Sequence, residues 1–305
     1  MLALIEITWW HWAAFIACIL FFLALDLGVF HRHAHVVRFK EALLWTLTWF
    51  TLAMLFAGGL VPLRGSKEAL QFLTGYLIEL SLSMDNVFVI ALIFGYFRVP
   101  AEYQHRVLFW GILGALVMRG AMIGAGVALI SAMSWILYVF GIFLIYTGIK
   151  MLLVETEVHP EKNRFIRLAR KFYPVTPHLD GQKFITVWNG QRALTPLALV
   201  LIMVETTDLI FAVDSIPAIF AVTTKPFIVF TSNVFAILGL RSMYFALARL
   251  MQLFHYLHYG LAAVLCFVGS KMLLGYFHLH IPVGIALSVI ATILGACIFI
   301  SVRFP

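Results

Sequence analysis

Two apolar stretches of this 305-residue sequence carry acidic side chains that a membrane-spanning helix seldom contains. The oxygen-bearing residues are Glu79, Asp85 and Asn86 in residues 72–97, and Glu205, Asp208, Asp214 and Ser215 in residues 196–221. A carboxylate near the bilayer centre costs roughly 2.5 to 3.5 kcal/mol on insertion scales, and residues kept there usually line an ion or proton path. The two stretches therefore predict an ion-binding site inside a membrane.

The ligand types favour a hard divalent cation. Carboxylates, an amide oxygen, a hydroxyl and freed backbone carbonyls are the oxygen ligands that such ions prefer. No Cys or His lies within either stretch, which argues against copper and less strongly against zinc. Residues six apart on a regular helix differ by about 120° and about 9 Å, so one ion cannot bind both Glu79 and Asp85 of an unbroken helix. Pro217 removes the hydrogen bond to the Val213 carbonyl and predicts a break beside Asp214.

The alternative is that the acids are paired with basic residues for structural reasons. The candidate partners are Arg119, Arg241, Lys150 and Lys271. The two lysines stand at span ends, from which a long side chain can reach the membrane interface, whereas the arginines lie deeper. Matched acid pairs in both halves of the chain are hard to explain by charge balance alone, so we favour the ion site.

Composition excludes a soluble globular domain, because 63% of residues are hydrophobic, 11% are charged and the mean hydropathy is +1.00. The net charge of +7 does not indicate nucleic acid as a partner, because most Lys and Arg residues lie in loops between apolar spans. Cys18, Cys266 and Cys297 fall within apolar spans and show no metal or redox spacing. No enzymatic constellation or nucleotide-binding loop is present, so neither an enzyme nor a bound cofactor is expected.

The fold class is an all-α polytopic membrane protein with about nine transmembrane helices. The expected spans are residues 8–29, 41–62, 70–96, 105–130, 134–153, 195–222, 226–250, 256–275 and 281–302. The positive-inside rule places the N-terminus outside and the C-terminus in the cytoplasm, because the basic loops then lie inside. Asp26 near the end of the first span fits either a structural or a functional role. The alternating His31, His33 and His35 are interpreted as a solvated loop rather than a metal-binding tract.

Residues 154–194 form the one sizeable segment outside the spans. Its first part predicts a short amphipathic helix on the inner leaflet, with Phe165, Ile166 and Phe172 on the apolar side. Its second part places Asn189 and Gly190 between two short runs, which is typical of a β-hairpin. We interpret the segment as a solvated connector, and a cytoplasmic gate is the alternative.

The acidic motifs also reveal an internal repeat. The matched pairs are Glu79–Asp208 and Asp85–Asp214 at an offset of 129 residues, Arg119–Arg241 at 122 and Lys150–Lys271 at 121. Each unit then contains three helices, residues 70–153 and 195–275, flanked by 1–69, the connector and a C-terminal helix in 276–305. Because three is odd, the second unit enters the membrane from the opposite side, and inverted repeats place the binding site at the midplane. Asp85 and Asp214 should therefore face each other there.

The stretches IELSLSMDNVFV and VETTDLIFAVDSIPAIFAVTT resemble the two signature motifs of the TerC family of membrane proteins, particularly its Alx-type members. The resemblance covers essentially the whole chain. It implies Mn²⁺ export across the bacterial inner membrane, with the acidic residues of both motifs essential. Carried over by position, these are Glu79, Asp85, Glu205, Asp208 and Asp214, with Asn86 and Ser215 as neutral neighbours.

The sequence and the resemblance together indicate a secondary transporter that moves Mn²⁺ outward by alternating access, with proton exchange as the coupling. The alternatives are a transporter of another divalent cation such as Ca²⁺, and a non-transporting membrane assembly or metal-homeostasis factor. Acid-rich motifs argue against an anion as substrate. The expected partners are membrane lipid and the divalent ion, and no particular oligomeric state is predicted.

Overall fold

The computed structural model of the chain describes residues 7–25, 39–153, 163–188, 190–247, 257–277, 279 and 281–303. The predictions for Asp26, for the tract of His31, His33 and His35, and for Asn189 lie outside these residues.

The described residues contain nine apolar helices at the positions that the hydropathy predicts. They are α1 (Trp9–Leu25), α2 (Phe39–Arg64), α3 (Ser66–Tyr96), α4 (Ala101–Ala132), α5 (Ile136–Leu153), α7 (Pro196–Phe220), α8 (Pro226–Leu247), α9 (Leu257–Leu274) and α10 (Val283–Arg303). Eight of them are long and apolar enough to cross a membrane, and α1, with 17 residues, is shorter. The all-α polytopic fold class is therefore confirmed.

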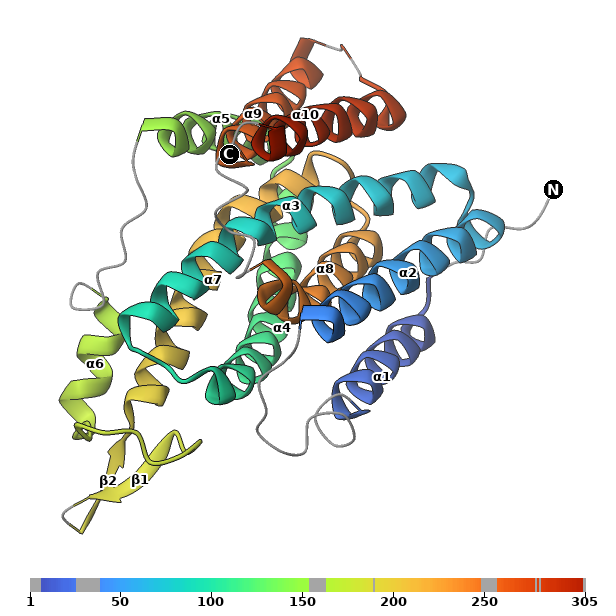
Figure 1. The fold of residues 1–305 in the computed structure, drawn as a ribbon. Helices are drawn as coiled ribbons and strands as arrows, with labels where there is room; N and C mark the ends of the chain where they lie inside the picture. The colour runs from blue at the N-terminus through green and yellow to red at the C-terminus, as the bar shows by residue number, and fades with distance from the viewer. Residues whose placement is uncertain are drawn as a thin grey trace.

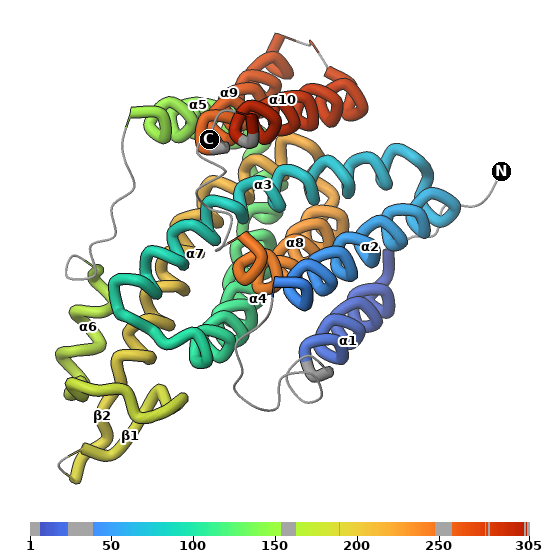
Figure 2. Tube along the Cα trace, viewed as in Figure 1, coloured from blue at the N-terminus to red at the C-terminus, as the bar shows by residue number. Residues whose placement is uncertain are grey.

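The helices pack around α8, which is buried along nearly its whole length by α2, α3 and α4. Helix α7 packs against both α3 and α4, so the two acidic helices are neighbours. Figures 1 and 2 show α5, α9 and α10 grouped on one side of this bundle, where α9 and α10 contact α3. Helix α1 lies at the opposite edge and packs through Phe15 on Phe56 of α2.

Helices α5 and α9 approach each other through glycines. A Cβ atom on Gly148 would lie 2.8 Å from the Ala262 carbonyl oxygen, and one on Gly269 would lie 2.6 Å from the Gly141 carbonyl oxygen. The sequence repeat equates Gly148 with Gly269, and the same offset equates Gly141 with Ala262. Such reciprocal contacts are what a two-fold axis produces. They are consistent with the two inverted units, whose complete superposition stays a prediction.

The segment outside the membrane contains the two predicted elements. Helix α6 (Arg164–Phe172) begins after Asn163, whose side chain accepts hydrogen bonds from two backbone N–H groups of the first turn. Ile166 is buried in the cluster that also contains residues of α7. Strands β1 (Ile185–Trp188) and β2 (Gln191–Leu194) form an antiparallel hairpin, and Gly190 takes the left-handed φ of +76° in its turn. Figure 1 shows both elements beside the first turns of α7.

The predicted break in the second acidic helix is wrong. Helix α7 continues as an α-helix from Pro196 to Phe220, and Pro217 lies in its last turn. A proline at that position removes only one donor, and the helix ends before further turns would be affected. The site is therefore built from continuous helices rather than from two half-helices. The Val213 carbonyl was a candidate ligand because of the predicted break, and that argument for it no longer holds.

Candidate functional site

The centre of the helical bundle holds an ion cluster around Arg119 of α4. Its guanidinium donates from Nη2 to Asp208 Oδ1 at 2.7 Å and from Nε to Asp208 Oδ2 at 3.1 Å, while Nη1 contacts Glu79 Oε1. Arg119 is 2% exposed, Glu79 is fully buried and Asp208 is 9% exposed. The fork of the guanidinium matches the two oxygens of Asp208, which is the geometry that makes arginine suitable for buried ion pairs.

Two neutral side chains complete this cluster. Arg119 Nη1 also donates to Ser215 Oγ at 3.3 Å, and the Asn86 amide lies 3.5 Å from Asp208 Oδ1. Glu79 is thus level with Ser215, and Asn86 is level with Asp208, so α3 and α7 run antiparallel past each other. Four of the seven predicted site residues come together around Arg119. The pairing of Glu79 and Asp208 with Arg119, which was the alternative to an ion site, is confirmed for these two acids.

Arg119 alone faces two carboxylates, so the three groups of the cluster carry a net charge of −1 when all are ionised, and a second buried arginine, Arg241, lines the cavity beside Asp208. Two of its acceptor atoms, Glu79 Oε2 and Asn86 Oδ1, are buried with no hydrogen-bond partner among the described residues. A buried acceptor without a partner costs about 1–3 kcal/mol. A proton that enters the cluster would cancel this net charge, and a bound cation could take these two oxygens as ligands.

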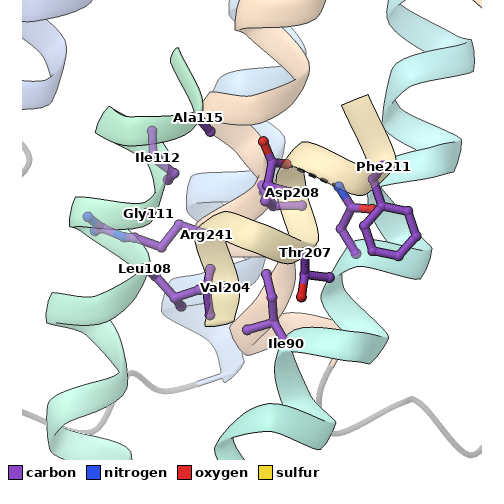
Figure 3. A pocket seen from close by; sticks show the side chains of 12 residues that line it. Ile90, Leu108, Gly111, Ile112, Ala115, Val204, Thr207, Asp208, Phe211 and Arg241 are labelled. Atoms are coloured by element: carbon purple, nitrogen blue, oxygen red, sulfur yellow. Dashed lines mark hydrogen bonds between the residues drawn. The ribbon is translucent and has the colours of Figure 1, made fainter. Parts of the chain in front are cut away.

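A small cavity adjoins the cluster between α3, α4, α7 and α8. Its polar lining consists of Asn86, Thr207, Asp208 and Arg241, and the rest of the lining is apolar. Figure 3 shows Thr207 and Asp208 of α7 at this cavity, with the hydrogen bond from Asn86 to Asp208 as a dashed line. The free volume of about 20 Å³ is enough for one water molecule. A single small species therefore fits beside the carboxylate of Asp208.

The carboxylates of Asp85 and Asp214 lie outside the Arg119 cluster and have different neighbours. Asp85 Oδ2 lies 3.8 Å from Nδ1 of His258 on α9, and Asp214 Oδ1 accepts a hydrogen bond of 3.2 Å from Thr147 of α5. The other ring nitrogen of His258 contacts the carbonyl oxygen of Met151, one turn beyond Thr147 on α5. Asp214 and, through His258, Asp85 are thus both connected to one side of α5, and the predicted facing of the two carboxylates stays a prediction.

Glu205 occupies a third position, against α4. Its carboxylate lies so close to Gly114 that a Cβ atom there would overlap it. Among the described residues Glu205 makes no hydrogen bond and no ion pair. The missing side chain of Gly114 provides the space that this acid occupies.

The described residues contain no group of three or more His, Cys, Asp or Glu side chains placed to hold one metal ion. The seven predicted ligands are therefore divided over three places in this conformation, namely the Arg119 cluster, the side of α5 and the contact with Gly114. Their role in metal binding stays a prediction. His258 was not singled out from the sequence, because it lies 44 residues or more from every acidic residue of the two motifs. An imidazole at the start of an apolar span was the one signal available.

Residues 64–304 match the family described as "Integral membrane protein TerC family". The uncharacterized membrane protein STKORF319 of Myxococcus xanthus is 57% identical over 95% of this chain and 91% of the relative. The protein named "Putative membrane-bound redox modulator Alx" in Escherichia coli (strain K12) is 50% identical over 93% of this chain and 91% of the relative. No solved structure gives a significant match.

Proposed function

Because the chain belongs to the TerC family of integral membrane proteins, we propose that it exports Mn²⁺ across the bacterial inner membrane in exchange for protons. The protein is then a secondary transporter and not an enzyme, with its N-terminus outside and its C-terminus in the cytoplasm. Mn²⁺ is its substrate rather than a resident cofactor.

The observation that carries the proposal is the position of Asp85 and Asp214. Both carboxylates lie within helices of membrane-spanning length, and neither reaches the guanidinium that compensates Glu79 and Asp208. Lys150 is near enough to Asp214 to attract it but forms no direct ion pair with it. An acid inside the membrane without a direct ion pair to a permanently charged side chain attracts a cation or a proton. Two such acids at positions that the repeat equates support a path for a divalent ion.

In this mechanism Asp85 and Asp214 bind the ion first. Glu79 and Asp208 exchange their contacts with Arg119 for contacts with the ion or with a proton, because the cluster has one negative charge more than its arginine can compensate. A carboxylate that releases Mn²⁺ takes up a proton before the protein, now without Mn²⁺, returns to the conformation that is open to the cytoplasm. Glu205, Asn86 and Ser215 supply further oxygens beside this route.

Flux measurements in liposomes test the proposal. Reconstituted protein should move Mn²⁺ faster when a pH gradient is imposed, and Asp85→Asn or Asp214→Asn should reduce the flux to that of empty liposomes. Lys67→Met is the matched control, because Lys67 is exposed at the start of α3 and should leave the flux unchanged. Full flux in correctly inserted Asp85→Asn protein would overturn the assignment.

Two other functions are outcomes of the same experiment. Ca²⁺ flux with no Mn²⁺ flux would indicate a transporter of a different divalent cation. The pairing of Glu79 and Asp208 with Arg119 also fits a structural role for the acids. Folded wild-type protein that moves no divalent cation would therefore favour a membrane assembly or metal-homeostasis factor.

A further inference from the structure

His258 holds its imidazole ring between two helices that carry the candidate site. The ring projects from the first turn of α9, with Nε2 at the Met151 carbonyl oxygen of α5 and Nδ1 at 3.8 Å from Asp85 Oδ2 of α3. Neither side chain is sealed in the interior, because His258 is 35% exposed and Asp85 is 21% exposed. A small ion can therefore reach the space between them.

The contact with Met151 determines which ring nitrogen carries a hydrogen. A backbone carbonyl oxygen can only accept, so Nε2 is the donor in this hydrogen bond. In the neutral ring Nδ1 then keeps its lone pair, and that lone pair is on the side of Asp85. A metal-ligating histidine typically has this arrangement, in which its other nitrogen donates to a carbonyl or carboxylate that fixes the ring.

The separation of Nδ1 from Asp85 Oδ2 fits a bridging ion better than a hydrogen bond. At 3.8 Å the two atoms are too far apart for a direct hydrogen bond. An ion about 2.1–2.2 Å from each atom would be bound at an angle of roughly 120–130°, which leaves room for further oxygen ligands. Asp214 bonds Thr147, one turn from Met151 on the same side of α5, which makes it the candidate for a later ligand.

We propose that His258 Nδ1 and Asp85 together bind the transported ion, and that the imidazole selects a transition metal over Ca²⁺ and Mg²⁺. The inference rests on the proposed function and adds a ligand and a basis for selectivity to it. Carboxylates and waters bind all three ions, whereas imidazole nitrogen is a ligand for transition metals, including Zn²⁺ and Fe²⁺ as well as Mn²⁺. With His258 in the site, the lack of His within the two acidic stretches no longer argues against zinc. His258 is then the residue that separates Mn²⁺ from the more abundant alkaline-earth ions.

Pulsed electron paramagnetic resonance of bound Mn²⁺ tests this proposal without any transport measurement. Full-length protein labelled with ¹⁵N-histidine should show a ¹⁵N coupling to Mn²⁺. The coupling should disappear in His258→Gln and remain in His178→Gln, a control in the connector outside the membrane. His258→Gln removes a direct ligand, so it should weaken Mn²⁺ binding by at least the roughly 10–100-fold that loss of an outer-shell partner costs, and Ca²⁺ binding much less.

The outcomes separate the two proposals. Nitrogen coupling in a protein that shows no Mn²⁺ flux would support His258 as a ligand and refute export. Mn²⁺ flux in a protein whose bound Mn²⁺ shows no nitrogen coupling would support export and refute His258 as a ligand. Wild-type protein that binds no Mn²⁺ would also refute the ligand assignment. If His258→Gln fails to fold, His258→Asn is the second variant, and a wild-type spectrum without nitrogen coupling refutes the assignment in either case.

Discussion

Replacing Arg119 by methionine should destabilise the protein strongly. The substitution keeps a long side chain but removes three recorded donations to carboxylate oxygens of Asp208 and Glu79, all of them in the interior. Removing one partner of a buried ion pair costs about 3–5 kcal/mol, because the remaining charge has no compensation. Here one arginine compensates two acids, so we expect the loss to lie in the upper part of that range.

Neutralising the acids as well should restore most of the stability. In the triple variant with Arg119→Met, Glu79→Gln and Asp208→Asn, no charge remains in the cluster. Replacing a whole buried ion pair by well-packed hydrophobic residues is often neutral or stabilising by about 1–4 kcal/mol. The two amides introduced here are polar, so the gain is smaller, but they cost less to bury than unpaired carboxylates. The triple variant should therefore be more stable than the single variant, although it contains more substitutions. Arg303→Met, at the exposed end of α10, is the control for loss of an arginine.

Denaturant unfolding of the detergent-solubilised protein, followed by tryptophan fluorescence, measures these differences. An Arg119→Met protein as stable as the wild type would refute the argument, since it would mean that the acids do not need the guanidinium. A triple variant less stable than the single variant would refute it as well. Mn²⁺ flux of a stable triple variant then shows separately how far transport depends on the cluster.

Two further predictions concern single contacts. Gly114→Ala places a methyl group on the Glu205 carboxylate and should displace it and lower Mn²⁺ flux, whereas Gly124→Ala in the same helix has open space around its Cβ. Equal flux in the two variants would contradict a role for that acid. The hydrogen bond from Thr186 lowers the pKa of Asp180 in the connector, so the stability it contributes is present above the ordinary carboxyl pKa and is lost as pH falls through the lowered value. Thr186→Val should raise that pKa in a carboxyl-carbon NMR titration, and an unchanged titration would contradict the assignment.

The positions of the helices were predictable from the sequence because long apolar runs must bury their backbone polar groups as helices within a membrane. The connector elements were predictable from local chemistry, namely the amphipathic pattern around Ile166 and the Gly190 turn. Pro217 misled the prediction, because the effect of a proline depends on how many turns follow it. The end of α7 at Phe220 could not be located closely enough from hydropathy to show that fewer than two turns remained.

The acidic residues of the site were also predictable, since charges in apolar spans stand out, but their partners were not. Arg119 stood among four possible partners, and tertiary packing brings it to Glu79 and Asp208 across 40 and 89 residues of sequence. His258 meets Asp85 only because α9 packs on α3 and α5. Helical periodicity describes the face of one helix and contains no information about which other helix covers it.

The two aspartates that the repeat equates have unlike neighbours, an imidazole beside Asp85 and a hydroxyl beside Asp214. In a passive exchanger, detailed balance requires the direction of net flow to follow the ion gradients alone, so this difference does not make the protein an exporter. What unlike ligands change is the affinity of each conformation for the ion. The asymmetry would thus set a different half-saturating Mn²⁺ concentration on each face of the membrane, and with it the cytoplasmic metal level at which export becomes appreciable.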